Sequence, residues 1–94
     1  MRILIVEDDP VLADGLQVSL RNAEYAVDWV PDGAMADRVL KDKVYDVMIL
    51  DLGLPKLDGF EVLKRLRARG SKLPVLILSA REGTEDRVRG LDLG

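Results

Sequence analysis

The sequence predicts an α/β domain built on a doubly wound parallel sheet, and two observations support this fold class. Short apolar runs alternate with segments of helical spacing along the 94 residues of the chain, which is the pattern of parallel strands joined through helices. Within each run the apolar residues are consecutive, as expected for strands that are buried on both faces. Because such crossovers are right-handed, we expect helices on both faces of the sheet.

The first half of the chain is predicted to alternate strand, helix, strand and helix. A strand over residues 3–6 precedes a helix that starts at Asp9 and Pro10, since acids are favoured as N-caps and proline at the first helical position. This helix is expected to end near residues 22–24. A second strand follows over residues 26–30, and Asp32 can cap a second helix. The apolar positions at helical spacing are Leu12, Leu16, Leu20 and Ala23 in the first helix and Ala36, Val39 and Leu40 in the second.

The second half repeats the alternation. A third strand over residues 47–50 runs into Asp51, and a loop follows that contains Gly53, Pro55 and the pair Asp58-Gly59. A third helix carries Phe60, Leu63 and Leu66 at helical spacing and is expected to stop at Gly70. Pro74 opens a fourth strand over residues 75–78. A weaker, charged helix is predicted over residues 82–93.

Composition excludes several kinds of site. The chain has no cysteine and no histidine, so disulfides, thiolate or imidazole metal ligands and an imidazole base of its own are ruled out. A net charge of -3 gives no nucleic-acid footprint. No apolar run approaches the roughly 20 residues of a membrane span, and the early acids argue against a signal peptide.

Acidic residues follow two of the predicted strands. Glu7 and Asp8 come after the first strand and Asp51 comes after the third. In the flavodoxin-like strand order 2-1-3-4 these strands are neighbours where the strand order reverses, so the three carboxylates converge at the carboxyl edge of the sheet. Ser79, directly after the fourth strand, joins the same rim. Converging carboxylates raise the pKa of at least one member unless a cation binds, and an oxygen-only ligand set with few carboxylates suits Mg2+.

Each of these residues also has a plain structural interpretation. Asp9 is better explained as a helix cap than as a ligand. Glu7 and Asp8 can form a solvated turn, Asp51 can cap the following loop, and Ser79 can be a small residue at a strand end. A shared site is favoured because all of them fall at the same end of their strands.

Three segments together resemble one protein family. "ILIVEDD", "DVMILDLGLPKLDGFEVLKRLR" and "LPVLILSAREGTEDRVRGLDLG" are similar to the receiver domain of bacterial response regulators, in the OmpR/PhoB-like branch, and the resemblance spans the whole chain. It implies a receiver (CheY-like) domain over residues 1–94 that is incomplete at its C-terminal end. The fifth strand and helix, the lysine after that strand and any DNA-binding domain are expected to be missing.

The resemblance also implies roles for individual residues. Asp51 corresponds to the phosphoacceptor, which takes a phosphoryl group from the phosphohistidine of a sensor histidine kinase. Ser79 corresponds to the switch hydroxyl, and the backbone amide of Ala80 to a phosphate contact. Pro55 and Asp58-Gly59 correspond to the loop that shapes the pocket. The implied Mg2+ ligands are Glu7, Asp8, Asp51 and the backbone carbonyl of Gly53.

The function implied is that of a switch in a two-component phosphorelay that regulates transcription in the cytoplasm. The domain is expected to catalyse only its own phosphorylation and dephosphorylation, so it is not an enzyme in the ordinary sense. Docking to the kinase is expected through the first helix, although Leu12, Val18 and Leu20 can equally belong to the core. The family implies homodimers of the full-length protein, and DNA contact only through the missing output domain.

Two other functions compete with this one. A receiver-like interaction module would work without phosphorylation. An aspartate-nucleophile phosphatase would have a second acid two residues after Asp51, and Gly53 occupies that position, which disfavours it. If the chain ends at Gly94, the apolar fourth strand is an exposed sheet edge, and self-association or segment swapping is expected.

Overall fold

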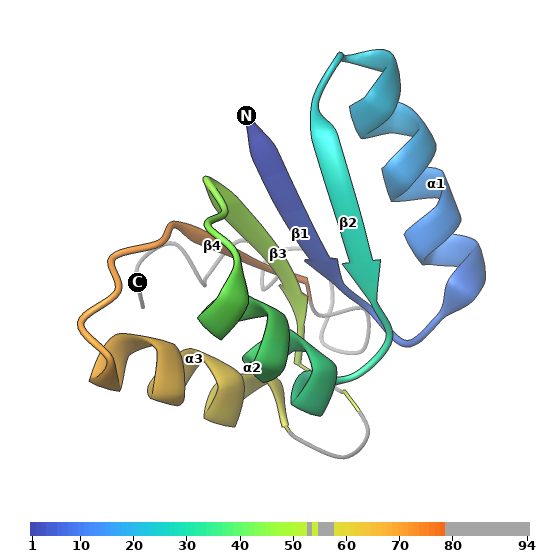
Figure 1. Ribbon diagram of the computed structural model, residues 1–94. Coiled ribbons are helices and arrows are strands. Elements are labelled where there is room, and N and C mark those ends of the chain that lie inside the picture. The colour runs from blue at the N-terminus through green and yellow to red at the C-terminus, as the bar shows by residue number, and fades with distance from the viewer. Residues whose placement is uncertain (53, 55–57, 79–94) are drawn as a thin grey trace.

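The computed structural model describes residues 1–52, 54 and 58–78 of the chain. Strands and helices alternate throughout these residues (Figure 1). The elements are β1 (Arg2–Val6), α1 (Pro10–Asn22), β2 (Ala26–Val30), α2 (Gly33–Asp42), β3 (Val47–Asp51), α3 (Gly59–Ala68) and β4 (Val75–Leu78). Every predicted strand is confirmed to within one residue at either end. The helix predicted over residues 82–93 lies outside the described residues.

The strands form one parallel sheet in the order β2-β1-β3-β4, which confirms the predicted doubly wound, flavodoxin-like order. The register places Val6 beside Val30 on one side and Leu50 on the other. The chain therefore leaves β1 and β3 at the same edge of the sheet, and whatever follows these two strands is brought together.

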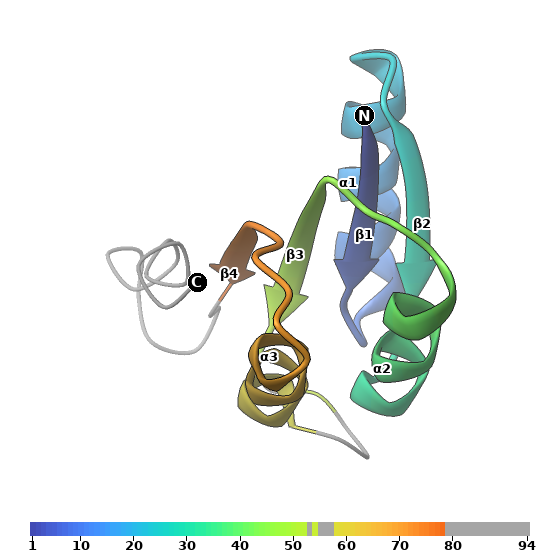
Figure 2. The same ribbon diagram turned by 60° about the vertical axis from the view of Figure 1, so that its left-hand side comes forward.

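Helix α1 covers one face of the sheet, and α2 and α3 cover the other (Figures 1 and 2). Alternate residues of each strand point to opposite faces, so β1 sends Ile3 and Ile5 towards the α1 side and Leu4 and Val6 towards the other side. Both faces are apolar because both are covered, which explains the unbroken apolar runs of the sequence.

Acidic caps start the helices at the expected places. The Asp9 carboxylate accepts a hydrogen bond of 3.0 Å from the Val11 N–H, and Asp32 accepts one of 2.9 Å from the Met35 N–H. Asp58, which the sequence suggested only as a loop residue, caps α3 by accepting from the Phe60 N–H at 2.7 Å. After α3 the chain turns at Gly70, where φ is 85°, as glycine allows.

One residue of the predicted apolar face is exposed in each of α1 and α3, whereas Leu16, Leu20, Leu63 and Leu66 pack on the core as predicted. Leu12 is 40% exposed and Phe60 is 53% exposed, whereas Ala13 and Val62 are fully buried. Helical spacing alone cannot separate neighbouring faces when apolar residues occupy both, and the sheet selects the face that packs. Val18 is also exposed, whereas Leu20 packs on the α1 side of the core.

No helix in the parts of the chain described above is both long and apolar enough to cross a membrane.

A buried carboxylate joins α2 to α3. The Asp37 side chain, 10% exposed, receives Arg69 at 3.0 Å and Lys41 and Arg65 each at 3.5 Å. Burial raises the pKa of Asp37, but the hydrogen bond from Arg69 and the charges of Lys41 and Arg69 outweigh it, so the pKa lies below its ordinary 3.8. Asp37 thus holds cations from both helices at their shared face.

We expect Asp37→Asn to lower the free energy of unfolding by about 1–3 kcal/mol, because charge-assisted hydrogen bonds are lost. The loss should appear above pH 3.8 and vanish as the pH falls through the folded-state pKa of Asp37, where the wild type also loses this stabilisation. Urea unfolding at several pH values measures it, with Asp42→Asn on the exposed end of α2 as the control. Equal effects of the two substitutions would contradict the role given to Asp37.

Candidate functional site

Glu7, Asp8 and Asp51 lie together at the carboxyl edge of the sheet. Each offers a carboxylate oxygen, and these oxygens all lie within 4.8 Å of one another. Glu7 and Asp8 follow β1, and Asp51 ends β3, the strand paired with β1. The predicted convergence is confirmed, and these three residues are called the acid cluster below.

The three side chains of the acid cluster differ in their exposure to solvent. Glu7 is 3% exposed, Asp51 is half-buried and Asp8 is exposed. One side of the cluster therefore lies in the protein and the other opens to solvent. A small ligand can reach the carboxylates from outside, while the inner carboxylate is fixed by its surroundings.

Three different groups of Glu7 are held by hydrogen bonds. Its N–H donates to the Val30 carbonyl at 3.2 Å, its carboxylate accepts from the Asp9 N–H at 2.9 Å, and its carbonyl accepts from the Trp29 indole N–H at 2.7 Å. Asp9 thus caps α1 with its side chain, and its backbone N–H binds the Glu7 carboxylate. Glu7 is therefore held through both its backbone and its side chain.

The surroundings of Glu7 raise its pKa from 4.5 to about 7. Burial is the largest cause. The Asp9 N–H lowers the pKa, but the negative charge of Asp51 and hydrogen bonds shared with the Asp8 and Asp51 side chains raise it further. In the absence of a cation the protein therefore relieves the repulsion between its carboxylates by keeping a proton on Glu7 near neutral pH.

The donor set fits a hard divalent cation. Carboxylate oxygens are the ligands that Mg2+ and Ca2+ accept, and Mg2+ binds through few carboxylates while it keeps several waters. The cluster combines a buried carboxylate with a raised pKa and an exposed one that faces solvent. A cation there can replace the proton of Glu7 and neutralise the repulsion.

Several predicted site residues cannot be compared with the structure. Gly53, Ser79 and Ala80, together with Pro55, lie outside the described residues. The register does place Leu78, the last residue of β4, beside Asp51.

Gly59 contributes to the site in a way that the loop prediction did not specify. It is buried at the start of α3, and a Cβ atom built there would lie 2.7 Å from the Asp51 carbonyl oxygen and 2.9 Å from the Leu52 Cα. Both of these are backbone atoms, which cannot turn away as a side chain can. The lack of a side chain at Gly59 lets α3 approach the backbone of Asp51.

We expect Gly59→Ala to lower the free energy of unfolding by about 1–3 kcal/mol, the usual effect of overpacking, and to weaken cation binding because the Asp51 backbone must shift. Gly15→Ala is the matched control, since a Cβ there meets nothing within 4 Å and alanine should stabilise α1 by about 0.5–1 kcal/mol. Urea unfolding and calorimetric Mg2+ titration measure both effects. A Gly59→Ala chain as stable as the wild type would refute the close approach.

The hydrogen bond from the Trp29 indole to the Glu7 carbonyl was not predicted from the sequence. The alternation of β2 places Val27 and Trp29 on the same face, but nothing in the pattern indicates that the ring reaches the carbonyl of Glu7. That contact depends on the register between β1 and β2, in which Trp29 is paired with Ile5.

Comparison with known proteins agrees with this geometry. The family model for the response regulator receiver domain matches residues 3–94. The transcriptional regulatory protein QseB of Haemophilus influenzae is 48% identical over 94 residues, which is 100% of this chain and 42% of that protein. The chain thus spans about two fifths of the length of the curated relatives it matches.

Solved structures of receiver domains are also similar. The receiver domain of the Francisella response regulator 1452 has a TM-score of 0.86 and 32% identity, over 99% of this chain and 77% of that one. The receiver domain of the sensor histidine kinase PA1611 from Pseudomonas aeruginosa, solved with a magnesium ion coordinated in its active-site cleft, has a TM-score of 0.81 and 34% identity, over 92% of this chain and 74% of that one.

Proposed function

The chain belongs to the response regulator receiver domain family, and on this premise we propose that Asp51 accepts a phosphoryl group from the phosphohistidine of a sensor histidine kinase. The observation that carries the proposal is the meeting of Asp51 with Glu7 and Asp8 within 4.8 Å. A lone carboxylate at a strand end has no special chemistry, but a carboxylate beside a cation site can accept a phosphoryl group, because a cation there would offset the negative charge that accumulates.

The transfer requires little covalent chemistry from the protein. A carboxylate oxygen of Asp51 forms a bond to phosphorus while the bond between phosphorus and the imidazole nitrogen of the donor breaks, and the leaving imidazole keeps that electron pair. Phosphoryl transfer depends mainly on in-line positioning and on neutralising charge. Asp51 is suited to this because β3 and the close approach of Gly59 fix its backbone.

We assign Mg2+ to the acid cluster, where it would neutralise negative charge on the carboxylates and on the phosphoryl oxygens. Glu7, Asp8 and Asp51 are the residues that would hold it. The PA1611 receiver domain supports this choice, since magnesium is coordinated in its active-site cleft. By resemblance to the family we further propose the Gly53 carbonyl as a ligand, the Ser79 hydroxyl as the switch and the Ala80 amide as a phosphate contact.

We further propose where this receiver domain acts and with which partners. The chain would act in the cytoplasm and would catalyse only its own phosphorylation and dephosphorylation. It would serve an output domain that regulates transcription, in line with relatives that are named transcriptional regulatory proteins. Val11, Leu12 and Val18 on α1 are exposed apolar residues and are the surface we propose for docking of the kinase.

Mass spectrometry of the intact chain tests the proposal. Incubation with a small phosphoryl donor such as acetyl phosphate should add the mass of one phosphoryl group, located on Asp51, when Mg2+ is present and not when it is removed by a chelator. A chain that binds Mg2+ but gains no mass would instead be a receiver-like interaction module. Steady turnover of a phosphomonoester would favour the phosphatase.

A further inference from the structure

We propose that Trp29 is a positioning residue for the acid cluster, through a hydrogen bond that fixes the peptide between Glu7 and Asp8. The indole Nε1 of Trp29 donates to the Glu7 carbonyl oxygen at 2.7 Å, at the short end of the range for an N–H donor. The inference rests on the proposed function, because it concerns the affinity of the cluster for Mg2+.

This hydrogen bond lies at the peptide that joins Glu7 to Asp8, two members of the acid cluster. The Glu7 carbonyl and the Asp8 N–H belong to one rigid peptide plane, and that plane joins two members of the acid cluster. Rotation of the plane would change the backbone angles on both sides and move the two carboxylates relative to each other. On the other side of Glu7, the N–H is already held by the Val30 carbonyl. The indole of Trp29 holds the peptide plane between Glu7 and Asp8 directly, through the carbonyl oxygen of Glu7.

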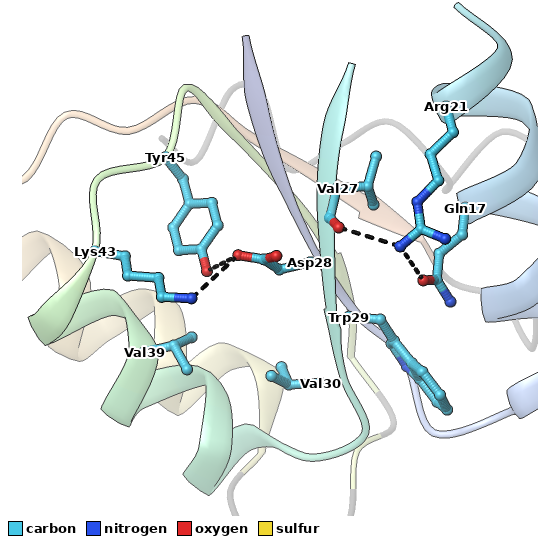
Figure 3. Close-up of a pocket in the computed structure, with 9 residues that line it drawn as sticks. All are labelled: Gln17, Arg21, Val27, Asp28, Trp29, Val30, Val39, Lys43 and Tyr45. Atoms are coloured by element: carbon cyan, nitrogen blue, oxygen red, sulfur yellow. Dashed lines mark hydrogen bonds and ion pairs between the residues drawn. The ribbon is translucent and has the colours of Figure 1, made fainter. Parts of the chain in front are cut away.

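The ring is able to act as a fixed donor. Trp29 is half-buried and packs on the α1-side core with Leu16 and Leu20 from α1. Figure 3 shows its side chain on the α1 side of β2, opposite Tyr45 and Asp28. The packing sets the orientation of the indole, so the donor is in place before a cation arrives.

Removal of the indole N–H should weaken Mg2+ binding about two- to tenfold, the effect expected for one hydrogen bond that orients metal ligands without touching the metal. The chain contains one tryptophan, so residue-specific incorporation of β-(3-benzothienyl)alanine, in which sulfur replaces the N–H, changes Trp29 alone and keeps the ring. Trp29→Phe is a genetic variant that also lacks the N–H donor, but it replaces the indole by a smaller ring.

Tyr45→Phe is the matched control. It also removes one hydrogen bond to β2, from the Tyr45 hydroxyl to Asp28 at 2.7 Å, but on the side of β2 opposite Trp29 (Figure 3). A merely structural contribution would lower the free energy of unfolding in both variants and leave the dissociation constant for Mg2+ of the folded chain unchanged. A positioning role changes that constant only when the indole N–H is lost.

The experiment is a calorimetric titration of each folded form with Mg2+, accompanied by the tryptophan emission of the wild type. We expect weaker binding in both forms that lack the N–H, wild-type binding in Tyr45→Phe, and a change of Trp29 emission as Mg2+ binds. Unchanged binding without the N–H would overturn the inference and leave the proposed function standing. Failure of the wild type itself to bind Mg2+ would overturn both.

Discussion

Asp51→Asn is expected to lower the rate of phosphoryl uptake about a thousandfold or more, since an amide oxygen is a far weaker nucleophile than a carboxylate. Asparagine has nearly the same shape as aspartate, so the fold around β3 should be kept. The measurement is the mass spectrometry described above, followed as a time course with acetyl phosphate and Mg2+. The same substitution removes a negative charge that raises the pKa of Glu7, so the metal-free variant should be more stable than the wild type near pH 8.

Asp14→Asn is the control for this substitution. Asp14 is an exposed residue of α1 outside the acid cluster, and its substitution should change neither the phosphoryl uptake nor the stability near pH 8. Uptake by Asp51→Asn at the wild-type rate would mean that another residue is the acceptor. Loss of uptake together with loss of the folded state would leave stability as the explanation, so the free energy of unfolding of each variant is measured first.

The meeting of the acids was predictable from the sequence because it follows from topology. Apolar runs that end in Asp8 and Asp51 identify the carboxyl ends of two strands, and parallel strands joined through helices place these ends at one edge. No side-chain detail is required. The same holds for Asp9 and Asp32, whose capping is a local property of the chain.

Features that depend on the register or rotation of packed elements were not predictable in this way. The Trp29 contact with Glu7 depends on the pairing of β2 with β1, and the close approach of Gly59 to Asp51 depends on how α3 enters the core. Leu12 and Phe60 were expected on the apolar faces of their helices, yet both are exposed, whereas Ala13 and Val62 are fully buried. Each of these outcomes is decided by long-range packing, which periodicity along the sequence does not encode.

The metal-free chain is expected to lose stability as the pH rises from about 4.5 to 7. The pKa of Glu7 is about 7 in the folded chain against its ordinary 4.5, so over this interval the folded state binds more protons than the unfolded state, and the free energy of unfolding falls with pH. At 1.36 kcal/mol for each pKa unit, the loss is on the order of 3 kcal/mol. Asp37 acts in the opposite sense but only below pH 3.8, outside this interval. Urea unfolding in the presence of a chelator measures the effect.

Glu7→Gln separates this effect from every other titration in the chain. The glutamine amide can donate hydrogen bonds to Asp8 and Asp51 as protonated Glu7 does, so the metal-free variant should match the wild type near pH 4 and exceed it by on the order of 3 kcal/mol above pH 7. The control Glu61→Gln, on the half-exposed side of α3, should keep the wild-type pH dependence. Saturating Mg2+ should stabilise the wild type by about 2.7 kcal/mol at one hundred times its dissociation constant, and Glu7→Gln by much less at the same concentration. A wild-type chain whose metal-free stability is flat between pH 5 and 8 would contradict the raised pKa of Glu7, because stability can be independent of pH there only if Glu7 ionises alike in the folded and unfolded states.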